Sequence, residues 1–168
     1  TSGSILSPSG KNSVVGLKPT IGLLSRTGIV PISSTLDTPG PMTKSVIDNA
    51  IFLNAMLGKD IQDDKSVESN INFVSDLKKY SLRGKRFGVL EDLMTDSLYA
   101  RNVNILERIG AEIVKINPER AQLNGFLTLL NIDMKYDLPT YLNSYANSNI
   151  SLKSISDIVD FNKLDSIK

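Results

Sequence analysis

The sequence predicts an α/β fold in which helices flank a mixed, twisted sheet. Two apolar stretches, Lys85–Leu90 and Ala111–Ile116, have the length and the residue types of strands. Between them lies a helical pattern that starts at Asp96 or Ser97 and ends at Gly110. Because a strand, a helix and a second strand with short connections are typical of a βαβ crossover, we expect a parallel pair covered by the helix.

The N-terminal part of the chain predicts loops rather than regular structure. Residues 1–45 are dense in Gly, Pro, Ser and Thr, and turn residues bound the short apolar pieces within them. The opening stretch Thr1–Gly10 (TSGSILSPSG) shows no capping pattern, and no apolar period begins before Val14. We therefore expect irregular loops with one to three short strands in residues 1–45.

A helix is expected to begin at Thr43, whose side chain can cap the first turn, and to stop at Gly58. Its apolar residues recur at helical spacing. Residues 59–72 are polar and predict a surface loop. The next stretch, Phe73–Tyr80, is compatible with a short helix.

The C-terminal part predicts further helices. After Pro118, we expect one from about Ala121 to Leu130 or beyond. Pro139 is expected to interrupt it, and Tyr141–Tyr145 is compatible with a separate helical piece. The last helix is expected at Ser154–Lys163.

Composition limits the classes of function. With 168 residues, 40% hydrophobic and 22% charged, the chain is typical of one soluble globular domain. Its net charge of +1 provides no bulk field for nucleic acid or for an anionic membrane, so we expect neither as a partner. No apolar run reaches the roughly 18 residues of a membrane helix. The absence of cysteine suits a reducing cytoplasm, which is the location we expect.

The absence of histidine is the most informative feature of the composition. It excludes a Ser-His-Asp triad and an imidazole metal site. A general base would have to be Lys, Asp, Glu, Tyr or the N-terminal amine. A zinc enzyme is therefore not expected.

Several short motifs follow one another over the first 58 residues: Gly3-Ser4-Ile5, Gly16-Leu17-Lys18-Pro19-Thr20, Ser25-Arg26 and Gly40-Pro41-Met42-Thr43. In this order they resemble the amidase signature family of serine hydrolases. The resemblance is weaker beyond Gly58 until SLKSISDIVDFNK, near the end. It implies that residues 1–168 are a fragment of a single amidase-signature domain, with residues 1–58 as the signature core and 59–168 as a variable α/β part. The fold it implies is a partial amidase-signature fold.

The resemblance implies hydrolysis of a carbon-nitrogen amide bond of a small-molecule substrate through a serine acyl-enzyme. It implies no metal and no cofactor. Family members use a nucleophilic Ser, a second Ser held by a cis peptide bond, and a Lys. Ser4 matches the nucleophile, whereas the Lys and the cis-Ser lie upstream of Thr1 in the family's layout. We therefore expect a central fragment without turnover of its own. The run of Thr1, Ser2, Gly3 and Ser4 corresponds to the oxyanion hole, whose donors are backbone N–H groups.

Two other functions are open at this stage. The A subunit of the tRNA-dependent amidotransferase, a glutaminase, shares these motifs. Alternatively, the chain is a non-catalytic remnant that associates with itself, because a parallel sheet cut at both ends leaves edge strands that invite a homodimer.

Other candidate residues have both a functional and a structural interpretation. Lys18 could replace the missing base, although a charge that lies on the surface or pairs locally is the better interpretation. Arg26 and Asp37 could orient a substrate loop, but we favour ion pairing and Asx-type hydrogen bonds that fix loops. Three tyrosines in the variable part either line a substrate pocket or serve as half-buried packing: Tyr136, Tyr141 and Tyr145. Two acidic pairs suggest a metal or acid-base site but are more simply solvated loop residues: Asp63-Asp64 and Glu91-Asp92.

Overall fold

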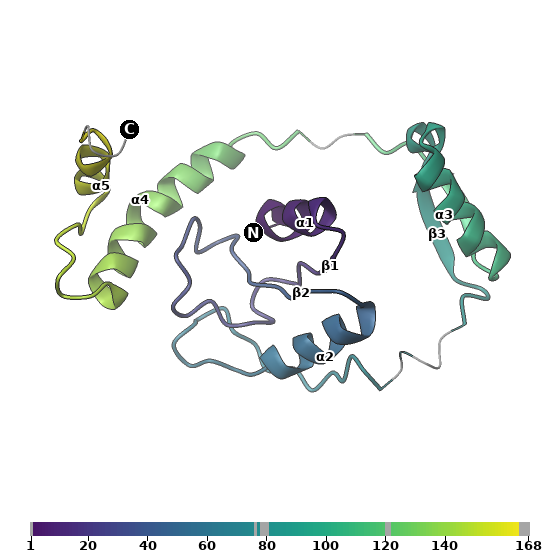
Figure 1. Cartoon of the computed structure of the whole chain (residues 1–168), viewed down its shortest axis with the longest axis horizontal. Helices are drawn as coiled ribbons and strands as arrows, with labels where there is room; N and C mark the ends of the chain where they lie inside the picture. The colour runs from purple at the N-terminus through teal and green to yellow at the C-terminus, as the bar shows by residue number, and fades with distance from the viewer. Residues whose placement is uncertain (1, 76, 78–80, 120–121, 165–168) are drawn as a thin grey trace. The chain divides into compact units, whose positions relative to one another are not determined.

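The structure is a computed structural model that describes residues 2–75, 77, 81–119 and 122–164. The regular structure of the described residues consists of helices and two small two-stranded sheets, which confirms the α/β class (Figure 1). The chain divides into two compact units, one formed by residues 1–74 and 125–168 and the other by residues 75–124.

Residues 2–11 form a helix, so the expectation of a loop was wrong for residues 2–10, while Thr1 lies outside the described residues. Helix α1 (Ser2–Lys11) contacts β1 (Val15–Gly16), which pairs antiparallel with β2 (Met42–Thr43). Tertiary packing overrides the weak helix propensity of this stretch. Ile5 is buried, and a Cβ on Gly40 would lie 2.9 Å from its Cδ1. A Cβ on Gly16 would lie 2.2 Å from the side-chain oxygen of Ser9, so both glycines allow α1 to pack closely.

Helix α2 spans Val46–Met56 and is capped by Ser45, not by Thr43 as the sequence suggested. Ser45 Oγ accepts from the backbone N–H of Asp48 at 3.1 Å. Thr43 instead belongs to β2, because its pairing with Val15 keeps the backbone extended. The helix ends two residues before Gly58, close to the expected position.

The segments 17–41 and 57–74 contain no helix or strand, as expected of loops. Residues 59–72 are nevertheless not a free surface loop, because Asp63 and Ser66 within it are buried. The expected helical piece at Phe73–Tyr80 lies partly outside the described residues.

The second unit confirms the predicted βαβ crossover. Strands β3 (Arg86–Leu90) and β4 (Glu112–Ile116) pair in parallel along their whole length. A 3₁₀ turn, η1 (Glu91–Thr95), and helix α3 (Ser97–Arg108) connect them. Asp96 caps α3, since its Oδ1 accepts from two backbone N–H groups of the first turn at 2.9 and 2.8 Å.

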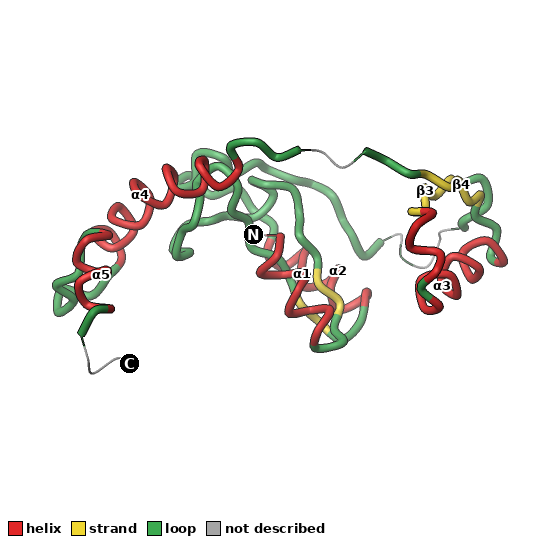
Figure 2. Tube along the Cα trace, turned by 90° about the horizontal axis from the view of Figure 1, so that it is seen from above, coloured by secondary structure: helices red, strands yellow, loops and turns green. Residues whose placement is uncertain are grey.

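The C-terminal part of the first unit contains helices α4 (Phe126–Tyr145) and α5 (Ile155–Asn162) (Figure 2). The expected break at Pro139 does not occur, and Tyr141–Tyr145 is the last turn of the same helix. A proline in a helix removes one backbone bond. Ser33 and Ser34 donate hydrogen bonds to Asp133 and Asp137 of α4, which lie one helical turn apart and shortly before this proline. These bonds attach the helix to the 33–34 loop.

Loss of the α5 cap is expected to loosen that helix. Ser154 Oγ accepts from the backbone N–H of Asp157 at 3.1 Å, and Asp157 Oδ2 accepts from the N–H of Ser154 at 2.8 Å. Replacing Ser154 by alanine should cost about 1 kcal/mol and speed amide hydrogen exchange in α5 about fivefold. Ser156→Ala, on the exposed face of the same helix, should leave exchange unchanged; equal acceleration in both variants would contradict the capping role.

Two kinds of feature are absent from the described residues. None of the helices there is long and apolar enough to cross a membrane. No group of three or more His, Cys, Asp or Glu side chains is arranged to hold a metal ion in the same part of the chain.

Candidate functional site

Ser4 lies in the first turn of helix α1 and is exposed. The first four N–H groups of an α-helix have no partner within the helix, and this end carries a partial positive charge. The backbone amides of Ser2, Gly3 and Ser4 therefore belong to a segment suited to binding a negatively charged oxygen. A Cβ added to Gly3 would meet no heavy atom within 4 Å, so the backbone is open at this point. Thr1, the fourth residue of the predicted oxyanion hole, lies outside the described residues.

The predicted nucleophile and oxyanion hole stay predictions, but their setting differs from the one expected. A helical first turn, not a glycine-containing loop, presents these amides. Lys18 follows the structural interpretation, because its Nζ donates to the carbonyl of the next residue, Pro19, at 2.9 Å.

Arg26 and Asp63 form a largely buried ion pair that joins two loops of the first unit. The side chains are 12% and 3% exposed. Asp63 Oδ2 accepts from Arg26 Nε and from the Arg26 backbone N–H, both at 2.9 Å, and Arg26 Nη2 contacts Oδ1. These bonds from Arg26 hold the pKa of Asp63 well below its ordinary value, against the opposing effect of burial. The expectation that Asp63 faces water was therefore wrong.

The same guanidinium also fixes the following loop. Arg26 Nη1 donates to the carbonyl of Ser34, and the hydrogen bond to Asp63 raises the pKa of Arg26. The preference for a loop-fixing ion pair is thus confirmed for Arg26.

Asp60 reinforces the same contact between loops, and the sequence reasoning did not anticipate it. Its Oδ2 accepts from Ser25 Oγ at 2.6 Å and from Thr27 Oγ1 at 2.5 Å. These two hydroxyls, Ser25 first, lower the pKa of Asp60. No sequence signal identified Asp60, because its partners lie 33 and 35 positions away.

Asp37 closes the loop that follows Arg26 by an Asx-type arrangement. Its Oδ2 accepts from the backbone N–H groups of Ile32 at 2.7 Å and Ser33 at 2.8 Å. This confirms the structural interpretation of Asp37.

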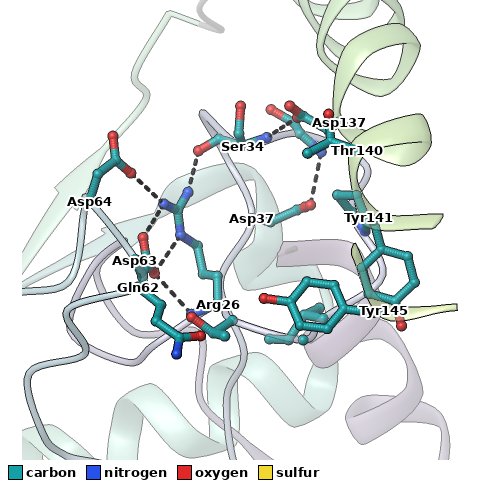
Figure 3. Close-up of a pocket in the computed structure, with 15 residues that line it drawn as sticks. Arg26, Ser34, Asp37, Gln62, Asp63, Asp64, Asp137, Thr140, Tyr141 and Tyr145 are labelled. Carbon is teal, nitrogen blue, oxygen red and sulfur yellow. Dashed lines mark hydrogen bonds and ion pairs between the residues drawn. The ribbon is translucent and has the colours of Figure 1, made fainter. Parts of the chain in front are cut away.

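Helix α4 lies against this loop through acidic side chains. Ser33 Oγ donates to Asp133, and the backbone N–H of Ser34 donates to Asp137 Oδ2 at 2.6 Å. The bond from Ser33 is the main cause that lowers the pKa of Asp133. A cavity of about 270 Å³ lies where α4 meets the loops around Arg26 and Asp63 (Figure 3).

Two of the three predicted tyrosines line this cavity. Tyr141 and Tyr145 contribute to its wall, whereas Tyr136 is 65% exposed and does not. None of the described lining residues belongs to α1, so the cavity lining does not include Ser4. The other acidic pair, Glu91-Asp92, lies in the second unit, where Glu91 contacts Asn117 at 2.9 Å.

Solved structures with a similar arrangement of elements include peptide amidases. The structure superposes on native peptide amidase from Stenotrophomonas maltophilia with a TM-score of 0.83 and 36% identity, covering 95% of this chain and 34% of that one. A family model described as Amidase matches residues 1–163. The chain belongs to the amidase family.

Sequence relatives point to two kinds of protein within the family. The A subunit of glutamyl-tRNA(Gln) amidotransferase from Synechococcus elongatus is 40% identical over 124 residues, which are 71% of this chain and 26% of that protein. An Arabidopsis thaliana protein described as a probable amidase is 32% identical over 176 aligned residues, 97% of this chain and 33% of that protein. The chain thus spans about a quarter to a third of the length of the relatives it matches.

Proposed function

We propose that this chain is part of a serine amidase and carries its nucleophile, Ser4. One observation carries the proposal: in a chain of the amidase family, Ser4 is exposed in the first turn of a helix. The sequence resemblance assigns the nucleophile to this serine. The likeness to peptide amidase supports an amide as the substrate. The positive end of α1 can stabilise the negative oxygen that forms on the substrate carbonyl.

The proposed reaction proceeds through an ester. Ser4 Oγ bonds to the carbonyl carbon, and its proton passes to a base, which the family resemblance assigns to a lysine acting through a second serine. The carbon-nitrogen bond then breaks, and the leaving nitrogen takes a proton. Water hydrolyses the acyl-serine, so that the acid is released and the hydroxyl of Ser4 is restored.

A free-standing amidase is preferred over the amidotransferase because of how much of the chain is matched. The alignment with the Synechococcus protein covers 71% of the chain, whereas that with the Arabidopsis protein covers 97% and the peptide amidase structure 95%. The 40% identity keeps the glutaminase as the second candidate. A second protein chain that co-purifies, together with release of ammonia from glutamine, would favour it.

A non-catalytic role is the third candidate. Within the described residues, each sheet has only two strands, so every strand has an unpaired edge through which two copies of the chain could pair. A dimer measured by light scattering, without hydrolysis in any context, would favour this role.

Ser4→Ala is expected to abolish amide hydrolysis by the proposed serine amidase. Ser7→Ala is the matched control, because Ser7 is an exposed serine of the same helix and should be dispensable. Reaction with a fluorophosphonate, followed by mass spectrometry, should label Ser4 and spare Ser7. Hydrolysis that survives Ser4→Ala would contradict the proposal.

The 168-residue chain alone is expected to show no turnover of a simple aryl amide or ester. The reason is that the family resemblance assigns the base to a lysine upstream of the motif that contains Ser4. Turnover by the isolated chain that Ser4→Ala removes would refute this expectation and would place the base within the chain.

A further inference from the structure

The cavity beside α4 contains an acidic group whose hydrogen bonding is incomplete. Asp37 lines the cavity and is only 7% exposed. Its Oδ2 is bound by two backbone N–H groups, but its Oδ1 is buried and has no hydrogen-bond partner among the described residues. In Figure 3 the visible oxygen of Asp37 is joined by a dashed line to a nitrogen, and Asp137 and the tyrosines of α4 are drawn around it in this view. A buried carboxylate oxygen without a donor is costly, so a donor from outside the chain would be favoured there.

The charges around the cavity favour a cation as that donor. Four carboxylates line it, Asp37, Asp63, Asp64 and Asp137, against one basic side chain, Arg26. Arg26 is already bound by Asp63 through two nitrogen atoms. Asp137 also lines the cavity, and its Oδ2 accepts only from the backbone N–H of Ser34 among the bonds of the described residues. An additional positive charge is therefore attracted, and an anion is repelled.

The remaining wall is aromatic and apolar. Tyr141 and Tyr145 stand next to each other on α4, with ring centroids 5.3 Å apart and planes inclined by 32°. Ile29 and Pro31 add aliphatic surface from the loop. Ring faces attract organic cations, and apolar walls accept a short carbon chain.

We propose that this cavity binds an organic ammonium group on a short apolar or aromatic stem. The ammonium donates to Asp37 and Asp137, while the stem packs on Tyr141 and Tyr145. A metal ion fits less well, because no three metal-type ligands converge within the described residues. The volume of about 270 Å³ suits a molecule the size of an arylalkylamine. The proposal does not depend on Ser4, which does not line the cavity.

Calorimetric titration of the chain with benzylamine at about pH 6 tests the proposal, since the amine is then protonated. We expect binding that is at least about tenfold tighter than that of benzyl alcohol, which has the same shape without the charge. Asp37→Asn should lower the affinity for benzylamine by about tenfold or more. The side-chain oxygen of an asparagine can still accept from the N–H groups of Ile32 and Ser33. Its NH₂ group, however, would place hydrogen-bond donors where Oδ1 of Asp37 was.

The matched control is Asp160→Asn, which makes the same change of charge on α5 and should leave binding unchanged. If Asp37→Asn does not fold, as judged by circular dichroism, Asp137→Asn and Tyr145→Leu replace it, each with an expected loss of about threefold or more. Equal binding of the alcohol, wild-type affinity in the folded Asp37→Asn protein, or no binding of benzylamine would each overturn the proposal. The last result would mean that water satisfies Asp37.

A second pair of ligands separates the two possible sources of the ammonium. L-phenylalaninamide has an ammonium group on its α-carbon and a carboxamide beside it. Its N-acetyl derivative keeps the carboxamide but lacks the positive charge. Binding of the first but not of the second supports the proposal. If L-phenylalaninamide binds more tightly than benzylamine, the cavity recognises ammonium-bearing amides; if it binds more weakly, the cavity recognises free amines.

Discussion

Replacing Asp63 by alanine is expected to lower the free energy of unfolding of the chain by about 3–5 kcal/mol. The reason is that Arg26, whose side chain is only 12% exposed, would keep its charge without the carboxylate that binds it. The backbone N–H of Arg26 would lose its acceptor as well. Urea titration followed by far-UV circular dichroism measures the change.

Asp64→Ala is the control for this experiment. Asp64 neighbours Asp63 and also contacts Arg26, but at 3.4 Å and with a side chain that is 79% exposed. Exposed ion pairs contribute at most about 1 kcal/mol, so this variant should change the free energy of unfolding by less than that. Equal losses of unfolding free energy in the two variants would show that the buried Arg26–Asp63 pair stabilises the fold no more than the exposed contact with Asp64 does.

The same pair predicts how stability depends on pH. The pKa of Asp63 is lowered in the folded state by its hydrogen bonds to Arg26, whereas in the unfolded state it should be about 3.9. The stability from this shift is fully present above the unfolded pKa and is lost as pH falls toward the lower folded pKa. The difference between wild type and Asp63→Ala should therefore shrink below about pH 4. A difference that stays constant in acid would contradict the ionic origin of the effect.

Elements whose signals lie within a few residues could be predicted from the sequence. In the β3–α3–β4 crossover, the two strand patterns, the helix cap at Asp96 and the helix-ending Gly110 follow one another within a short stretch of sequence. Helix α5 likewise contains its own cap, Ser154. Such elements need no information from distant parts of the chain.

Helix α1 could not be predicted in this way, because its stability depends on residues outside it. Ser, Gly and Pro within it favour a loop locally. The close approach of the helix to Gly16 and Gly40, which have no side chain, buries Ile5 and allows the helical form. Similarly, α4 continues through Pro139 while bonds from the 33–34 loop hold the helix.

In the candidate site too, local features could be predicted from the sequence, whereas contacts between distant residues could not. The chemistry of Arg26 and Asp37 indicated loop-fixing roles, but not their partners, since Asp63 is 37 positions from Arg26. The cavity likewise depends on contacts such as that between Ser34 and Asp137, 103 positions apart. The assignment of Ser4, by contrast, rests on a local motif, and it stays a prediction until its reactivity is measured.

Gly22→Ala is expected to cost about 2–5 kcal/mol of the free energy of unfolding. Gly22 has φ +86°, and a Cβ there would lie 2.1 Å from the carbonyl oxygen of Lys65. Its own carbonyl accepts from the N–H of Val67 at 2.9 Å, so the two loops cannot separate without losing a bond. Gly28→Ala is the control: its φ is +76°, but no heavy atom lies within 4 Å of the added Cβ. This variant should lose only the about 1–2 kcal/mol of the strained backbone.

Combining Gly22→Ala with Asp63→Ala tests whether the two effects have one cause. Both substitutions act on the attachment of the 60–67 loop to residues 22–26, one through backbone contact and the other through Arg26. Once one substitution has released this loop, the other has less to disrupt. The loss in the double variant should therefore fall short of the sum of the single losses by about 1 kcal/mol or more. Strict additivity would mean that Gly22 and the Arg26–Asp63 pair stabilise the unit independently.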